Sequence, residues 1–275
     1  MQKQRYVYPI QERDHWHVVH WHPVNWGRIV AFTVFWEILY HAAKTFFARS
    51  CSHNPKMVEH GASYMVALVN ACVCVFFGCW LVLMLHGSDE YACALADVNE
   101  NVDVVMPVVT VAVQSFVAWL LIDGMHTAVH FPALGGVDTL LHHVGFIALP
   151  LIGYGLRVLP FLVGWLLLGE ISSLFINVRW FLINSARGET KALAIANYAF
   201  AGTFFIFRIV VFWAGLAHLL QRSRPLLLDS PFHAPSWALN IICAFVAGAA
   251  QLNVFWMFKI VKMIIRNARG KPGSE

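Results

Sequence analysis

Residues 61–86 read GASYMVALVNACVCVFFGCWLVLMLH, an apolar run without a single Asp, Glu, Lys or Arg. An α-helix needs about 20 consecutive apolar residues to cross the hydrocarbon core of a bilayer. A helix on the surface of a soluble protein buries only one face, so a run that is apolar on every side indicates burial all round. This stretch therefore predicts a transmembrane helix.

The whole chain has the same character. Of its 275 residues, 59% are hydrophobic and 12% are charged, whereas about 25% of the residues of a soluble domain are charged. We therefore predict an all-α, polytopic transmembrane bundle of about seven helices in an integral membrane protein. Six further runs predict the other spans: 26–48, 104–122, 137–157, 158–183, 195–220 and 236–265.

Turn-forming residues divide these spans. Pro160, close after Arg157, predicts a tight hairpin between the fourth and fifth spans. The segment 123–136, DGMHTAVHFPALGG, contains Pro132 and paired glycines, and we expect regular helix to stop there.

The resulting organisation has four parts. They are a polar, aromatic tail at 1–25, a first helix and loop at 26–59, a helical core at 60–266 and a tail at 267–275.

Lys and Arg residues are more numerous on the C-terminal side of the predicted spans than on the N-terminal side. With an odd number of spans, this bias places the C-terminus in the cytosol. The net charge of +4 is modest and forms no basic face, so we expect no nucleic-acid partner.

Two polar features precede the core. Glu37, His41 and Lys44 share one face of the first helix, which should point into protein or towards the membrane interface. The tail at 1–25 is rich in Trp and His, including His15, His17, His20 and His22. We interpret these as interfacial residues that could contact membrane-protein partners.

Ionisable residues inside spans are costly, and they are candidates for function by default. The candidates are His142, His143, Glu170 and Arg208, with Asp123 and Asp138 beside the expected break in helix. We expect Glu170 or Arg208 to face the bundle interior, within reach of a polar partner.

Helical spacing adds two polar groups to these candidates. Glu170, Ser173 and Asn177 recur at i, i+3 and i+7, which places them on one helix face.

A di-iron hydroxylase needs several His boxes, because each iron takes several imidazole ligands. His126 and His130 have the spacing of one box, but Thr139 stands where the first His of a second box is needed before His142 and His143. We therefore predict no metal site.

Three segments carry a family resemblance: VDTLLHHVGFIALP (137–150), LLGEISSLFINVRWFL (167–182) and LNVFWMFKIVK (252–262). They resemble, in order and spacing, the His-His helix, the Glu-Ser-Asn-Arg-Trp helix and the closing helix of the TLC-domain family. The resemblance covers roughly residues 60–266 and implies that the last six helices form a TLC-type core.

The best-understood relatives are ceramide synthases, which transfer an acyl group from acyl-CoA. The resemblance implies catalytic roles for His142, His143 and Glu170, with Glu170 orienting an imidazole. If the chain is an enzyme, it resembles an acyltransferase with acyl-CoA as substrate and no bound cofactor. The expected substrate-binding residues are Asp123, Asp138, Ser173, Asn177, Arg208, Asn253 and Trp256.

Gly169 and Ser173 stand where a synthase has a His and a second Asp. The chain thus resembles the non-synthase branch, which is associated with membrane lipid composition. We expect it to bind or modify lipids in the endoplasmic reticulum membrane. The alternative is a non-catalytic structural subunit of a larger complex, such as a respiratory or ATP-synthase assembly of the mitochondrial inner membrane.

Overall fold

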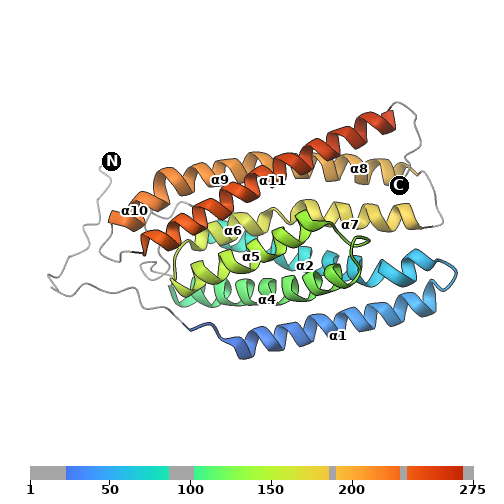
Figure 1. The fold of residues 1–275 in the computed structure, drawn as a ribbon, viewed down its shortest axis with the longest axis horizontal. Helices are drawn as coiled ribbons and strands as arrows, with labels where there is room; N and C mark the ends of the chain where they lie inside the picture. The colour runs from blue at the N-terminus through green and yellow to red at the C-terminus, as the bar shows by residue number, and fades with distance from the viewer. Residues whose placement is uncertain (1–22, 87–101, 186–189, 230–233, 269–275) are drawn as a thin grey trace.

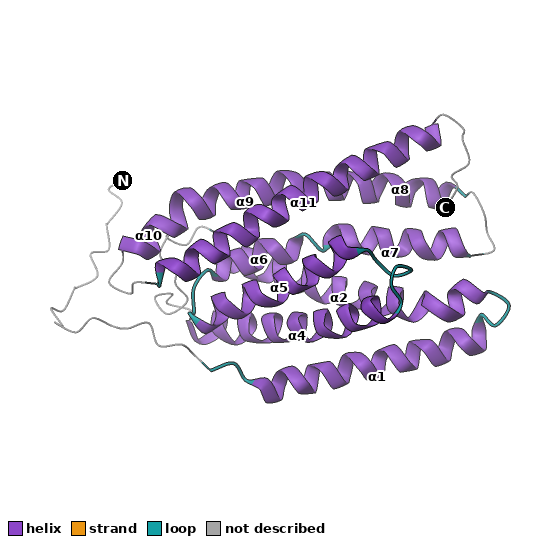
Figure 2. Cartoon of the chain, viewed as in Figure 1, coloured by secondary structure: helices purple, strands orange, loops and turns teal. Residues whose placement is uncertain are grey.

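The computed structural model describes residues 23–86, 102–185, 190–229 and 234–268. Every regular element in these residues is a helix (Figure 2). The first helices are α1 (Trp26–Ser50), α2 (Pro55–Leu85), α4 (Val102–Val129) and α5 (Val137–Gly155). They are followed by α6 (Pro160–Leu168), α7 (Ile171–Asn184), the composite helix Lys191–Asp229 and α11 (Ser236–Ala268).

Within the described residues, six helical segments are long and apolar enough to cross a membrane. The first helix forms over the predicted range and carries Arg28, Glu37, Lys44 and Arg49, but it is not among these six. The all-α polytopic bundle is therefore confirmed.

The helices lie roughly side by side along the long axis of the molecule (Figure 1). The first begins at one end of the bundle, and α11 finishes at the opposite end. The predicted odd number of membrane spans and the cytosolic position of the C-terminus both stay predictions.

Of the three residues on the predicted polar face of α1, Glu37 points into protein, whereas His41 and Lys44 are exposed. Glu37 Oε2 lies 3.4 Å from His126 Nε2 of α4, and the Tyr40 ring stacks on the His126 ring with centroids 3.9 Å apart. Trp36 Nε1 also donates to the Ser115 carbonyl oxygen (3.1 Å). Polar and aromatic contacts therefore join α1 to the core.

The expected break at 123–136 is wrong over its first half. Helix α4 continues to Val129, so Asp123 and His126 are helical residues. A segment at membrane depth satisfies its backbone groups by remaining helical, and the cluster of Pro132 and paired glycines ends the helix only after Val129.

The predicted hairpin between α5 and α6 is present. Arg157 and Leu159 adopt left-handed backbone conformations, with φ of 51° and 63°, which L-residues seldom adopt outside turns. Pro160 is the first residue of α6, where its missing N–H costs nothing.

Two glycines bring α2 and α6 into close backbone contact. A Cβ added at Gly78 would lie 3.0 Å from the Gly164 carbonyl oxygen, and one added at Gly164 would lie 3.0 Å from the Leu81 Cβ. Small residues at helix interfaces allow this approach in membranes, where the close packing itself drives association.

We predict that Gly78→Val will destabilise the bundle by about 1–3 kcal/mol, because the added methyl groups must push the two backbones apart. Thermal unfolding of the purified protein in detergent measures the change. Gly202→Val is the matched control, since a Cβ there would meet nothing within 4 Å. Equal stability of the two variants would contradict the close packing.

Candidate functional site

The site is built around a break between α6 and α7. Gly169 and Glu170 form the turn that joins the two helices, and the buried side chain of Arg208 lies against it. Arg208 Nη2 donates to Glu170 Oε1 (2.8 Å), and its Nε lies within 3.1 Å of the Gly169 carbonyl oxygen and 3.0 Å of Ser172 Oγ. One guanidinium group thus satisfies both a carboxylate and a backbone carbonyl freed by the break.

Arg208 is carried by an unusual helix. It lies in the π-helical segment η2 (Phe204–Val211), within the composite helix Lys191–Asp229. A π-helical turn is wider than an α-helical turn, and such turns occur frequently at functional sites. The remainder of this composite helix is α8 (Lys191–Thr203), α9 (Phe212–His218), η3 (Leu219–Ser223) and α10 (Arg224–Asp229).

The first turns of α7 extend the polar surface, as the i, i+3, i+7 spacing predicted. The Ser173 hydroxyl donates to Glu170 Oε2 (2.6 Å), and Asn177 Nδ2 donates to the Ser173 carbonyl oxygen (2.7 Å). Arg208 Nη2 also reaches Ser173 Oγ (3.2 Å). The expectation that Glu170 or Arg208 faces a polar partner inside the bundle is therefore confirmed for both.

A second polar pair joins α4 to α5. His143 Nδ1 lies 2.7 Å from the Thr139 carbonyl oxygen, which can only accept, so Nδ1 carries a hydrogen. His143 Nε2 lies 2.8 Å from Asp123 Oδ2, and one proton lies between these two atoms. The pair is either an imidazolium with a carboxylate or a neutral imidazole with a carboxylic acid.

This geometry corrects the predicted role of Glu170. A carboxylate does orient one of the two histidines, but it is Asp123, since Glu170 is paired with Arg208. The spacing of residues along one helix could not reveal that Asp123 takes the role expected of Glu170, because the two acids lie in different parts of the bundle.

His142 differs from its neighbour. Its ring contacts the rings of Phe146 and Trp256, at centroid distances of 4.3 and 5.3 Å. Among the described residues, it makes no hydrogen bond. Both of its ring nitrogens are thus available to a bound molecule.

A third polar contact joins α5 to α11. Asp138 Oδ2 accepts hydrogen bonds from Trp256 Nε1 (2.9 Å) and from Lys259 Nζ (3.2 Å). It lies in the first turn of α5, where a carboxylate also interacts favourably with the helix dipole.

These groups surround a cavity of about 480 Å³, which we call the polar cavity. Eight of the ten predicted site residues line it: Asp123, His142, His143, Glu170, Ser173, Asn177, Arg208 and Trp256. The other two do not line the cavity. Asp138 accepts hydrogen bonds from the lining residues Trp256 and Lys259, and Asn253 is buried elsewhere.

The rest of the lining of the polar cavity is largely apolar and aromatic. It includes Ala67, Phe116, Trp119, Phe200 and Phe204. A cavity lined by both polar and apolar groups suits an amphiphilic molecule.

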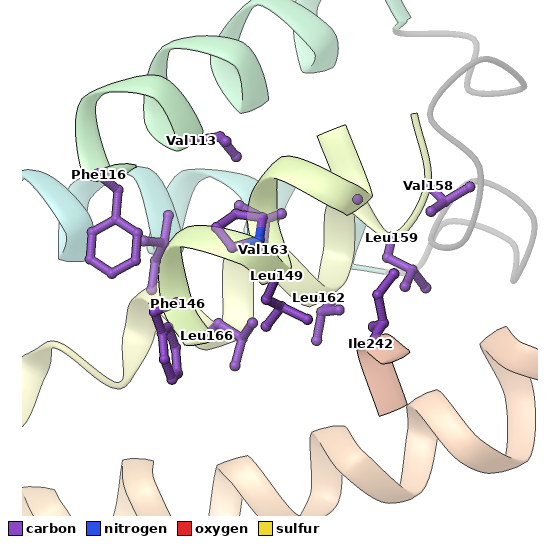
Figure 3. Close-up of a pocket in the computed structure, with 13 residues that line it drawn as sticks. Val113, Phe116, Phe146, Leu149, Val158, Leu159, Leu162, Val163, Leu166 and Ile242 are labelled. Carbon is purple, nitrogen blue, oxygen red and sulfur yellow. The ribbon is translucent and has the colours of Figure 1, made fainter. Parts of the chain in front are cut away.

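A smaller apolar pocket lies beyond Phe116. Its volume is about 30 Å³, and its lining is hydrophobic throughout (Figure 3). Phe116 also lines the polar cavity, and its ring meets that of Phe146 edge to face, with centroids 6.5 Å apart. Phe116 is thus shared by the polar cavity and the apolar pocket, whereas Phe146 lines only the apolar pocket of these two.

Sequence reasoning missed several polar residues that line this site, among them Ser172, Arg179 and Lys259. Lys259 and Arg179 line the polar cavity, and Ser172 binds Arg208. Arg179 lies within the quoted 167–182 segment, and Lys259 interrupts the last span. Treating every charge inside a predicted span as a candidate would have found both.

Comparison with known proteins is consistent with this fold. Residues 62–262 match the family model described as the TLC domain. The chain belongs to the TLC-domain family. The match confirms the resemblance seen in the three segments.

Individual relatives agree with the non-synthase branch. The chain is 26% identical to TLC domain-containing protein 4-B of Danio rerio over 252 residues, which are 89% of each chain. It is also 31% identical over 127 residues to TLC domain-containing protein 4-A of Xenopus laevis, covering 45% of this chain and 48% of that one.

We predict that Arg208→Leu and Glu170→Leu will each destabilise the TLC domain by about 3–5 kcal/mol, because each leaves an uncompensated buried charge. The double variant should lose less than the sum of the two. Thermal unfolding in detergent across the four proteins measures this coupling.

Lys259→Met is the control for that cycle. It breaks a contact with Asp138 in which the Lys259 side chain is 54% exposed, and such pairs contribute about 0–1 kcal/mol. Additive losses in the cycle would show that Arg208 and Glu170 do not depend on each other.

Proposed function

We propose that this TLC-domain protein binds a membrane lipid with its polar head in the polar cavity and acts in membrane lipid homeostasis. The observation that carries the proposal is an amphiphilic cavity inside a membrane bundle. Its lining combines Arg208, Glu170 and the His143–Asp123 pair with several aromatic side chains. A lipid likewise combines a polar part with an apolar part.

The lining also favours a lipid over water alone. Ala67, Phe116 and Phe204 are part of the lining, and they gain nothing from contact with water. A hydrocarbon segment beside them removes apolar surface from water, at about 25 cal/mol per Å². Polar groups in the same lining, such as the His142 ring and Lys259, can meet the polar head of the lipid.

We predict that Ala67→Trp will reduce lipid occupancy about tenfold, equal to about 1.4 kcal/mol, because the indole ring occupies the cavity. Native mass spectrometry of the purified protein measures the bound lipid, and thermal unfolding verifies the fold. Ala42→Trp is the matched control, since Ala42 is exposed on α1 and lines none of these hollows. Unchanged occupancy in Ala67→Trp would count against lipid binding here.

Acyl transfer is the reaction that this site would carry, with an acyl-CoA thioester as donor. The specific observation is the contrast between the two histidines: His143 is braced by Asp123, and His142 has an open ring beside the cavity. His142 would take the proton from an attacking amine or hydroxyl as the new acyl bond forms. The thioester C–S bond then breaks, and the thiolate leaves with a proton.

We predict that His142→Ala will reduce acyl transfer by about 10²–10⁴-fold, the usual contribution of a general base, while the protein stays folded. His142→Phe is a second variant that retains the ring contacts with Phe146 and Trp256. Lipid profiles of cells at matched protein levels measure turnover. A profile identical to that of the wild type would exclude catalysis by His142.

We propose the endoplasmic reticulum as the compartment, because bilayer lipids are made there. The alternative role, as a structural subunit in the mitochondrial inner membrane, rests on the tail at 1–25. Residues 1–22 of that tail, with their four histidines, lie outside the described residues, and no contact in the described residues favours this role.

A further inference from the structure

A second large hollow lies between α5 and α11. Its volume is about 470 Å³, and we call it the α5–α11 groove. Its lining is apolar apart from His142. The residues are Leu141, His142, Gly145, Phe146 and Leu149 of α5, and Ile241, Ala244, Phe245, Gly248, Ala249 and Leu252 of α11.

Small residues keep this groove open. A Cβ added at Gly248 would meet no heavy atom within 4 Å, so the space beside it is unfilled. At Gly145, an added Cβ would lie 3.3 Å from the Phe245 ring, which packs into the space left by the absent side chain. Ala244 and Ala249 add little bulk to the α11 wall.

The groove faces the membrane. Both α5 and α11 are among the helices long and apolar enough to span a bilayer. Leu141 is 67% exposed and Phe245 is 39% exposed, and at this depth an exposed apolar side chain contacts lipid tails. The groove is therefore open to hydrocarbon.

The groove and the polar cavity follow one another along the same helix pair. On α11, the groove residues lie between Ile241 and Leu252, and the cavity residues lie between Trp256 and Met263. On α5, His142 lines both hollows. A molecule that extends past His142 therefore has a polar surface at one end and an apolar channel at the other.

We propose that the α5–α11 groove holds one hydrocarbon chain of a bilayer lipid, and that lipid enters the polar cavity sideways from the membrane through this groove. This inference rests on the proposed lipid binding and adds the route and the position of the chain. The open ring of His142 then lies beside the junction of head and chain. Phe146, which contacts His142 and also lines the small apolar pocket, forms the inner wall of the route.

The test uses a fatty acid that carries a photoactivatable diazirine in mid-chain, supplied in phosphatidylcholine vesicles containing the full-length protein. After illumination, cross-linked residues are mapped by mass spectrometry. In the wild type, we expect cross-links within 141–149 and 241–252. We also expect lipid bound in the polar cavity, measured by native mass spectrometry as above. Gly248→Leu should reduce both about tenfold, because its side chain fills the groove.

Gly202→Leu is the matched control. An added Cβ at Gly202 also meets nothing within 4 Å, but this residue of α8 lines neither the groove nor the polar cavity. It should leave cross-linking unchanged. Ala244→Trp fills the groove from another position, so the test remains decisive if Gly248→Leu does not fold.

Three results would overturn the proposal, and they differ in what else they affect. If Gly248→Leu and Ala244→Trp leave cavity occupancy unchanged, the route is wrong while lipid binding stands. If cross-links spread evenly over all lipid-facing helices, the groove holds only bulk lipid, and the route is again wrong. If the wild type shows no cross-link in either hollow, lipid binding in the polar cavity is wrong as well.

Discussion

An arginine and a glutamate can lie inside a membrane bundle only as partners, because hydrocarbon offers neither of them water. Here Arg208 and Glu170 are both buried and their charged atoms are 2.8 Å apart. That contact holds η2 against the break between α6 and α7. Nε of the same arginine also donates to the Gly169 carbonyl oxygen. The polar part of the cavity lining depends on the Arg208–Glu170 pair, because Ser173 is hydrogen-bonded to both of its members.

Consecutive histidines have opposite environments for a geometric reason. Neighbouring residues of an α-helix, at 3.6 residues per turn, point about 100° apart. His143 is therefore turned towards Asp123 of α4, whereas His142 is turned towards Trp256 of α11. One imidazole is fixed at both nitrogens, and the other is left open to the cavity.

Neighbouring hollows of the TLC domain share residues that carry rings, and the polar cavity and the α5–α11 groove share His142. Phe116 lies between the polar cavity and the small apolar pocket, and Phe146 lines both that pocket and the α5–α11 groove. Rings can turn to admit a chain without leaving a polar group unpaired. In the function proposed above, hydrogen bonds in the polar cavity select the head group, while the groove accepts any hydrocarbon chain that fits its width.

The sequence by itself determined the helices, because hydropathy over about 20 residues is a local property. It also determined that Glu170, Ser173 and Asn177 share a face, since that follows from helix geometry alone. The turn-forming residues led to a predicted end of α4 that is too early. Pro132 and the paired glycines break a helix only at their own positions, and a helix at membrane depth continues up to them. Only the tertiary structure decided that Asp123 pairs with His143 and that Arg208 pairs with Glu170. These pairs join residues 20 and 38 positions apart, and the packing of helices, not their spacing along the chain, sets which side chains meet.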